Sequence, residues 1–257
     1  MLLPRVIPAL LLRGRGLVKT TRFKDPVYVG DPFNTIKIFN DKEVDELALL
    51  DIAATAEGRG PDMRFLAEAV SEAFVPLAYG GGLRTVEQLH ELFKLGVEKA
   101  IMNTAALDDP GLVRRAADRF GSQSVVVSMD VRKPLLSGYR VYRGNGSKET
   151  PHDPVAWAVQ LQEAGAGELL VTAIDRDGTF KGYDLDLVRS VSRAVDIPVI
   201  ASGGAASVEN LVEAVAAGAS AVAAGALFVF QRPHRAVLIS FPSRQALEVA
   251  FAPVLLA

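Results

Sequence analysis

Two stretches of sequence decide the fold: VPLAYGGGLRTVEQLHELFKLG at residues 75–96 and IPVIASGGAASVENLVEAVAAG at residues 197–218. Each begins with a short apolar run, passes through glycines and continues with the apolar spacing of a helix. The helical segments begin after a candidate N-cap, Thr85 or Ser207, and each closes at a glycine that suits a C-cap. Each stretch therefore predicts a strand, a glycine-rich turn and a helix.

The two stretches are copies of one pattern. A shift of 122 residues places Pro76 on Pro198 without a gap. Eight positions are identical in this alignment: Pro76, Gly81, Gly82, Val86, Glu87, Leu89, Glu91 and Gly96. Any two strand–helix units share some likeness, but eight ungapped identities favour duplication. Because the period is about half the chain, the sequence predicts two related half-barrels.

Eight apolar runs alternate with helical segments along the chain. Continuous runs of this kind are typical of parallel strands that are buried on both faces. Eight evenly spaced units favour a closed (β/α)8 TIM-type barrel of the α/β class over an open doubly wound sheet, with residues 1–257 as one domain. The runs are residues 5–12, 46–52, 75–82, 99–103, 124–131, 168–178, 197–204 and 220–228.

Composition excludes several classes of function. The 257 residues are 49% hydrophobic and 23% charged with a net charge of -2, which argues against a disordered chain and against a nucleic-acid binder. The absence of cysteine excludes disulfides, thiolate metal sites and a cysteine nucleophile, and fits a cytoplasmic protein. The apolar N-terminus suggests a buried strand rather than a signal peptide, and residues 215–230 a helix end, a turn and a strand rather than a membrane span. The three histidines lack metal-ligand spacing, so we expect no metal, and no cofactor is indicated.

Glycines at two strand ends suggest phosphate sites. Residues 80–82 and 203–204 each precede a helix, where backbone N–H groups can approach an anion. Tight turns also need glycine, so one pair alone is weak evidence. Two equivalent turns half a barrel apart predict a ligand with a phosphate at each end. Asn103, Thr104, Gly225 and Ala226 end the neighbouring strands.

Carboxylates also lie at predicted strand ends. Asp130 ends the fifth strand and is a candidate general acid or base, while Asp51, Asp175 and Asp177 are weaker candidates, since they could cap helices or pair with loop arginines. Long segments at residues 12–29 and 131–151 follow the first and fifth strands and are expected to cover a substrate; the second contains a GNG hairpin turn.

Four further charges begin strands and should meet at the opposite face of the barrel. They are Arg5, Glu46, Lys99 and Glu168. Two cations and two anions can form a ring of ion pairs, but buried charges are costly unless they are paired. The ring is therefore either a structural plug or a polar entrance to the barrel axis.

Several motifs resemble the cyclase subunit of imidazole glycerol phosphate synthase: RVIP, VGDP, ADRFGSQ, GAGELL, DRDGTFKGYDL and IPVIASGGA. The resemblance implies a barrel that forms a heterodimer with a glutaminase and receives its ammonia through the N-terminal face. It implies an ammonia gate at Arg5, Glu46, Lys99 and Glu168. It also implies phosphate contacts at Gly82, Asn103 and Thr104, at Gly178, Gly204, Gly225 and Ala226, and a substrate contact at Lys19 on a mobile loop.

One position departs from this family. The family's catalytic aspartates end strands one and five; Asp130 is present, but Leu11 in ALLL occupies the strand-one position. Leucine cannot move a proton, and loss of one acid/base group costs about 10²–10⁴-fold in rate.

The stretches ALLLRGRGLVKTTRFKDPVYVGDP and HRAVLISFPSR are similar to an offshoot of the family that serves acetamidino-sugar formation in surface polysaccharides. The resemblance to that offshoot implies ammonia supply rather than cyclisation, and leaves open whether a sugar amidotransferase is a further partner. Two alternatives stay open: a genuine histidine-pathway cyclase with a phosphorylated substrate, and a scaffold that only activates the glutaminase.

Overall fold

The computed structural model describes residues 3–134 and 137–255. Residues 1–2 of the apolar N-terminus, residues 135–136 of the second predicted cover and residues 256–257 lie outside this description. Eight parallel strands form the centre: β1 (Arg5–Arg13), β4 (Leu47–Asp51), β5 (Leu77–Gly80), β6 (Lys99–Met102), β7 (Val125–Arg132), β10 (Glu168–Ala173), β11 (Val199–Ser202) and β12 (Ala221–Ala224).

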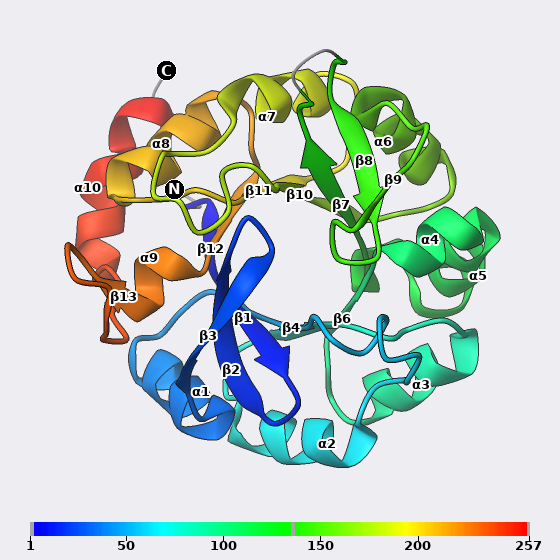
Figure 1. Cartoon of the computed structure of the whole chain (residues 1–257), viewed down its shortest axis with the longest axis horizontal. Helices are drawn as coiled ribbons and strands as arrows, with labels where there is room; N and C mark the ends of the chain where they lie inside the picture. The colour runs from blue at the N-terminus through cyan, green and yellow to red at the C-terminus, as the bar shows by residue number, and fades with distance from the viewer. Residues whose placement is uncertain (1–2, 135–136, 256–257) are drawn as a thin grey trace.

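The sheet closes on itself. Each of these strands pairs in parallel with the next, and the circle is completed where β12 pairs with β1 through Arg5 and Ala221. Helices surround the barrel (Figure 1). The predicted (β/α)8 barrel is therefore confirmed, and the open doubly wound sheet is excluded.

The helices that follow the barrel strands form the outer layer. Their bounds are α1 (Pro32–Asp41), α2 (Met63–Glu72), α3 (Val86–Lys94), α4 (Thr104–Asp108), α5 (Pro110–Phe120), α6 (Pro154–Glu163), α7 (Leu185–Ser192), α8 (Val208–Ala216), α9 (Ala226–Val229) and α10 (Arg244–Leu255). A short 3-10 helix, Ser122–Ser124, precedes β7. No helix in the described ranges has the length and apolar character that a bilayer span requires.

The two helices in the repeated stretches begin differently. Thr85 caps α3 as predicted, because its side chain accepts from the Gln88 backbone N–H and the Gln88 side chain returns a contact to the cap. Ser207 holds the N-cap position of α8, but its hydroxyl makes no capping hydrogen bond to the backbone. The predicted capping contact of Ser207 is therefore absent, although the helix begins at the predicted position.

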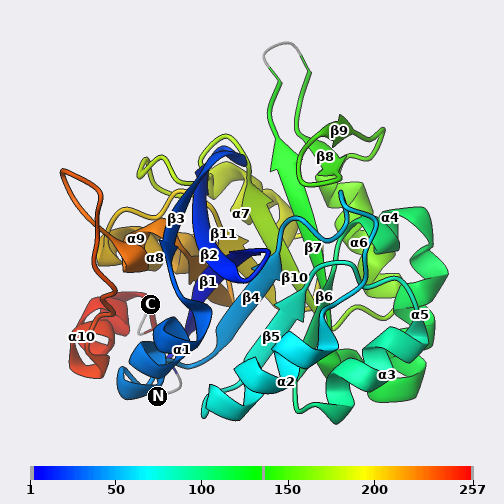
Figure 2. The ribbon, with the colours of Figure 1, turned by 60° about the horizontal axis from the view of Figure 1, so that its bottom comes forward.

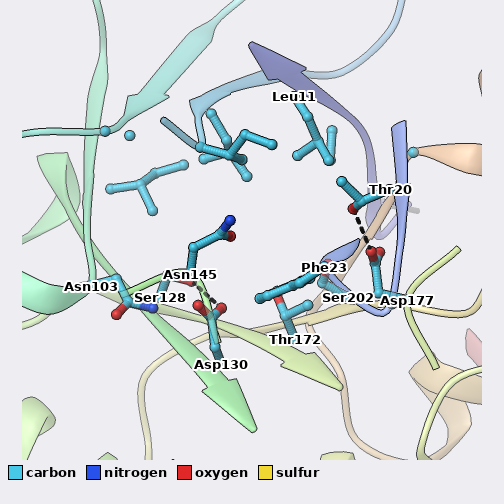
Figure 3. A pocket seen from close by; sticks show the side chains of 18 of the residues that line it. Leu11, Thr20, Phe23, Asn103, Ser128, Asp130, Asn145, Thr172, Asp177 and Ser202 are labelled. Carbon is cyan, nitrogen blue, oxygen red and sulfur yellow. Dashed lines mark hydrogen bonds between the residues drawn. The ribbon is translucent and has the colours of Figure 1, made fainter. Parts of the chain in front are cut away.

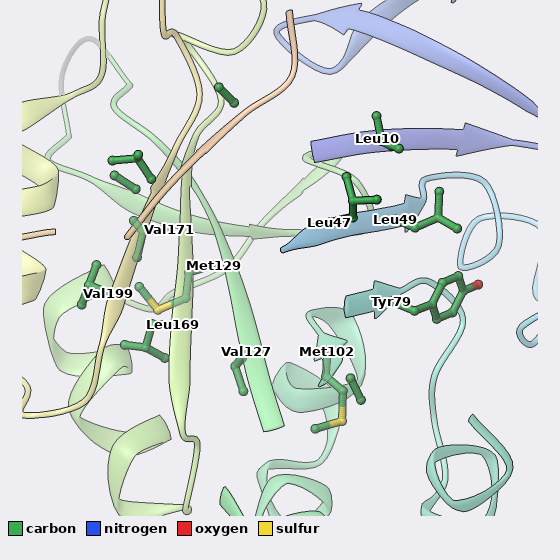
Figure 4. Packing of buried hydrophobic residues seen from close by; sticks show 14 of the residues in the cluster. Leu10, Leu47, Leu49, Tyr79, Met102, Val127, Met129, Leu169, Val171 and Val199 are labelled. Atoms are coloured by element: carbon green, nitrogen blue, oxygen red, sulfur yellow. The ribbon is translucent and has the colours of Figure 1, made fainter. Parts of the chain in front are cut away.

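Alternate side chains of the strands build two apolar layers. One face of each strand packs against the helices, as Leu47, Leu49 and Tyr79 do (Figure 4). The other face fills the barrel interior with Ile7, Ala48, Ala78, Ile101, Val126, Leu170, Ile200, Ala221 and Ala223. Burial of one such large apolar side chain contributes about 1.5–3 kcal/mol. Alanine at several interior positions leaves the axis less crowded than larger residues would.

The two predicted covers are largely β structure. β1 extends into a hairpin with β2 (Gly16–Thr21), which pairs with β3 (Lys24–Gly30). β7 likewise extends into β8 (Arg140–Arg143), which pairs with β9 (Lys148–Glu149) through the GNG turn. Both arms rise on the same side of the barrel (Figure 2). A third hairpin, β13 (Phe230–Gln231) with β14 (Ala236–Val237), follows α9.

Candidate functional site

A cavity of about 150 Å³ opens at the carboxyl ends of the barrel strands. It is lined by all of the residues that the family resemblance implied as catalytic, substrate or phosphate contacts at this end of the barrel. They are Leu11, Lys19, Gly82, Asn103, Thr104, Asp130, Gly178, Gly204, Gly225 and Ala226. We call this cavity the mouth. Asp51 and Asp177 also line it, whereas the weaker candidate Asp175 does not.

Asp130 supplies a buried acid to the mouth. It is 8% exposed and lies near the end of β7, with the Ser128 hydroxyl 3.5 Å from its Oδ1. Burial raises the pKa of Asp130 to about 7, and the nearby charge of Asp177 adds to this effect. Near neutral pH the group is therefore shared between its acid and base forms, which suits proton transfer in either direction.

Lys19 lies in the first arm, which is the hairpin formed by the end of β1 with β2 and β3. It is part of β2, is 6% exposed, and donates a hydrogen bond to the carbonyl oxygen of Ala9. Burial lowers the pKa of its amine to about 8, and the carboxylate of Asp177 opposes this change. A Cβ on Gly225 would overlap with Lys19 Nζ and come within 2.9 Å of the Ala9 carbonyl oxygen, so a larger residue there would displace the lysine or strain the strand. The family resemblance implied a mobile loop at Lys19, but this segment is the strand β2, because β1 continues into a hairpin with it.

Asp177 connects the first arm to the loop after β10. Its pKa is raised by burial, against the pull of Lys19. Its Oδ2 accepts from the Thr20 hydroxyl at 3.3 Å (Figure 3), and its carbonyl accepts from the Arg22 N–H at 2.9 Å. These contacts fix the arm over the mouth.

Backbone conformations that favour glycine occur at both ends of the mouth. Gly82 has φ of +68°, and Thr104 beside it begins α4 and accepts a hydrogen bond from the Gly144 N–H at 3.0 Å. Across the mouth, Gly178 has φ of +68° and Gly204 has φ of +107°. The Oδ1 atom of Asn103 is buried and has no hydrogen-bond partner among the described residues. Both ends therefore present glycine backbone at the cavity, and the end that includes Gly82 also contains the Asn103 oxygen that is unpaired within the described residues.

Leu11 forms an apolar wall opposite Asp130 (Figure 3). It pairs in register with Leu50 of β4 and Val18 of β2 and is half-buried. The two walls of the mouth thus differ in chemistry: one carries Asp130, Ser128, Thr172 and Ser202, and the other carries aliphatic side chains.

The remaining predicted carboxylates pair with arginines. Asp51 accepts from Arg59 Nη1 at 2.8 Å and caps the turn through the Ala53 N–H. Asp175 lies 3.3 Å from Arg132 Nε. Asp51 and Asp175 therefore both pair with arginines, which is the alternative to a catalytic role that the sequence left open.

Phe23 and Asn145 line the mouth from the two arms, and the sequence did not single them out. Asn145 has φ of +57° in the GNG turn and points between Leu11 and Asp130 (Figure 3). A Cβ on Gly146 would come within 2.9 Å of the Phe23 ring, so the arms touch. The signal available for Asn145 was its place in a turn that needs positive φ. For Ser128 it was its spacing of two residues from Asp130, which puts both on one strand face.

The four charges at the strand starts meet in a ring. Glu46 Oε2 accepts from Arg5 Nη1 at 2.5 Å and from Lys99 Nζ at 2.8 Å. Glu168 Oε1 accepts from Arg5 Nη2 at 3.0 Å and from Lys99 Nζ at 3.1 Å. Burial alone would lower the pKa of Arg5, but its two glutamate partners raise it above its ordinary value. The charges are paired, as burial requires.

A second, small cavity of about 10 Å³ lies on the axis between the ring and the mouth. Its lining includes Glu46 from the ring, Ala9 from the mouth, and the interior residues Ile7, Ala48 and Ile101. A volume near this size accommodates about one water molecule. The axis therefore has room for one small molecule above the ring.

Other polar groups show no comparable site. His90 stacks on Phe120 and His152 packs on Trp157, while His234 is exposed in the third hairpin. Within residues 3–134 and 137–255, no group of three histidine or acidic side chains could hold a metal ion.

Comparison with known proteins places this geometry in a family. Residues 5–233 match a family described as "Histidine biosynthesis protein". A Pseudomonas aeruginosa protein with the provisional name imidazole glycerol phosphate synthase subunit hisF2 is 53% identical over 246 residues, which cover 95% of this chain and 98% of the relative. A Leptospira interrogans relative with the provisional name subunit HisF is 42% identical over 98% of this chain and all of the relative. Imidazole glycerol phosphate synthase subunit HisF of Trichormus variabilis is 42% identical over 85% of this chain and 86% of the relative. The chain therefore belongs to the histidine biosynthesis protein family, with the HisF-type imidazole glycerol phosphate synthase subunits.

Proposed function

We propose that this chain is the barrel subunit of a glutamine-dependent ammonia-transfer complex. A glutaminase subunit binds at the N-terminal face, and its ammonia passes the ring and the axial cavity to the mouth. There it is supplied for acetamidino-sugar formation in surface polysaccharide biosynthesis. One observation carries the proposal: the ring and axial cavity are present, whereas Leu11 fills the position where the related cyclases carry an aspartate.

The chemistry of the axis favours neutral ammonia as the cargo. Its lining above the ring is aliphatic, and an ammonium ion would lose its hydration there without a counter-charge. The ring uses only one oxygen of each glutamate: Glu46 Oε2 and Glu168 Oε1 each accept from two donors. The second oxygen of each carboxylate can therefore accept a hydrogen bond from the incoming molecule. The Oε2 atom of Glu168 is buried and has no partner among the described residues, so it is available for this contact.

At the mouth, Asp130 receives ammonia beside a ligand held at both ends. With its pKa raised to about 7, Asp130 takes up the proton that ammonia loses when it attacks an electrophilic carbon. A cyclisation that also needs a carboxylate on strand one has no such group here, because Leu11 offers only methyl groups. The mouth therefore supports delivery of the nucleophile better than the complete cyclase reaction.

A genuine histidine-pathway cyclase is the second candidate. The intact Asp130 and the glycine turns at both ends of the mouth favour it, because a bisphosphorylated ribonucleotide would use all of them. It would convert the phosphoribulosyl-formimino carboxamide ribonucleotide and ammonia to imidazole glycerol phosphate and aminoimidazole carboxamide ribonucleotide.

The test uses the full chain with the glutaminase from the same organism and glutamine as the nitrogen source. We expect ammonia transfer to a sugar amidotransferase acceptor, and turnover of the histidine-pathway ribonucleotide at least about 10²-fold below an ordinary rate. Normal turnover of the ribonucleotide would replace this proposal by the cyclase. A scaffold would be indicated if neutralising both Lys99 and Glu168 left glutamine-dependent transfer unchanged.

A further inference from the structure

Phe74 is the most exposed large hydrophobic residue of the described chain. Its exposed fraction is 84%, compared with 50% for Val237 in the third hairpin. A single exposed apolar side chain needs no explanation by itself. Two further observations distinguish Phe74: hydrogen bonds hold the backbone of its turn, and the turn lies at the same face as the ring of ion pairs.

The backbone at Phe74 is fixed by three hydrogen bonds. The Phe74 N–H donates to Asn40 Oδ1 at 3.1 Å, and Asn40 Nδ2 donates to the Glu72 carbonyl at 2.6 Å. The Ala73 N–H donates to the Val70 carbonyl at 3.1 Å. The ring is therefore held out in solvent by a rigid turn. Because the backbone of the turn is already ordered, a partner that covers the ring does not have to order this segment.

The turn that carries Phe74 lies at the same face as the ring of ion pairs. It connects α2 to the start of β5, where the Pro76 carbonyl accepts from the Leu47 N–H at 2.8 Å. Leu47 follows Glu46, one of the two acceptors in the ring. Phe74 is thus beside the entrance through which the proposed function brings ammonia into the barrel.

Charges near this turn indicate the chemistry of the partner. The neighbouring helix-to-strand loops expose Glu43, Asp45 and Glu98, and Lys42 is the exposed cation among them. A second copy of this chain would bring the same acidic loops against themselves in a twofold contact, which like charges oppose. The surface instead fits a partner with an apolar pocket that is bordered by lysine or arginine.

We infer that Phe74 is the aromatic anchor by which the glutaminase docks over the ring of ion pairs. The inference rests on the proposed function, because a partner must cover the entrance if ammonia is to enter without loss to solvent. The acidic loops around Phe74 orient the encounter, and burial of the ring in the partner's pocket holds the complex together.

The test measures the dissociation constant between the full chain and the purified glutaminase from the same organism by calorimetry. Phe74→Asp should raise the dissociation constant roughly 30-fold or more, and Phe74→Leu should raise it less. Val237→Asp is the matched control, since it adds the same charge at an exposed apolar residue on the opposite face and should leave binding unchanged. The melting temperature of each variant should stay at the wild-type value, because neither side chain is buried.

The outcomes separate the two claims. If the wild-type chain binds the glutaminase and Phe74→Asp binds equally well, Phe74 is not the anchor and the proposed function stands. If the wild-type chain does not bind the glutaminase, the proposed function fails, and the inference fails with it. Self-association of the wild-type chain that Phe74→Asp abolishes would show that a second copy is the occupant, and would overturn the inference.

Discussion

The substitution Leu11→Asp gives the sharpest test of how the mouth works. The new carboxylate would project from β1 into the mouth opposite Asp130, at the position to which the family resemblance assigns the strand-one aspartate. Leu11 is half-buried, so loss of its apolar contacts with Leu50 and Val18 should cost about 1 kcal/mol of folding stability. The barrel should tolerate this change.

The expected gain in rate follows from the missing proton transfer. A positioned acid or base contributes about 10²–10⁴-fold, which corresponds to about 3–5 kcal/mol of the activation barrier. With the histidine-pathway ribonucleotide as substrate and ammonium chloride as nitrogen source, Leu11→Asp should turn over at least about 10²-fold faster than the wild-type chain. Supplying ammonium directly makes the assay independent of the glutaminase.

Leu11→Asn controls for shape, since it has a similar size to aspartate and cannot transfer a proton. It should lose the same stability and gain no activity. The reasoning is refuted if the wild-type chain already turns over at an ordinary rate of about 1–10³ s⁻¹ and Leu11→Asp is no faster.

Three further predictions concern the ring, the buried acid and one end of the mouth. Glu168→Gln removes the acceptor charge shared by Arg5 and Lys99, so glutamine-dependent transfer should fall while ammonium-driven activity is retained, with a stability loss of about 1–3 kcal/mol; equal loss of both activities would contradict an entrance role. Folded Asp130 binds its proton up to a pH near 7, whereas the unfolded group releases it near 3.8, so wild-type stability should decrease as pH rises from 4 to 7. Relative to the wild type, Asp130→Asn should gain up to about 4 kcal/mol over that range, and parallel melting curves for the two proteins would refute this account. Gly204→Ala places a methyl group 2.9 Å from Arg176 Cβ and against the Gly182 carbonyl, at a backbone φ of +107°. It should lower the folding stability by about 2 kcal/mol or more and reduce the thermal shift produced by inorganic phosphate. The control Gly14→Ala, at φ of +62° in open space, should lower the stability by about 1 kcal/mol and keep that shift.

The barrel could be predicted from the sequence because its signals are local and repeated. Apolar runs of the kind that is buried on both faces recur eight times, and the strand–glycine–helix pattern occurs twice half a chain apart, so closure into a barrel could be predicted from them. The strand-start charges could be assigned to one face for the same reason, since every parallel strand in the barrel begins there. The distances between Arg5, Lys99 and their two glutamates required the folded chain, because they depend on side-chain directions across the barrel.

The arms were predicted less well. Residues 12–29 contain glycines and charges that indicate a loop, yet the chain continues β1 into a hairpin, since Leu11, Leu12 and Arg13 find antiparallel partners in β2. Burial of Lys19 follows from this pairing and from the space that Gly225 leaves, and neither contact is local in sequence. Phe23 and Asn145 were missed for the same reason, as each enters the mouth only through the fold of its arm.

The axial arrangement has an evolutionary consequence. The ring and the mouth occupy opposite ends of the same strands, with an aliphatic layer between them. Under the proposed function, a mutation at Leu11 would redirect the nitrogen to a new product without disturbing the ring, and a mutation in the docking surface would change the donor without disturbing the mouth. A lineage with this architecture would then exchange either end independently, and gene duplication would yield barrels that share a nitrogen source and differ in what they build.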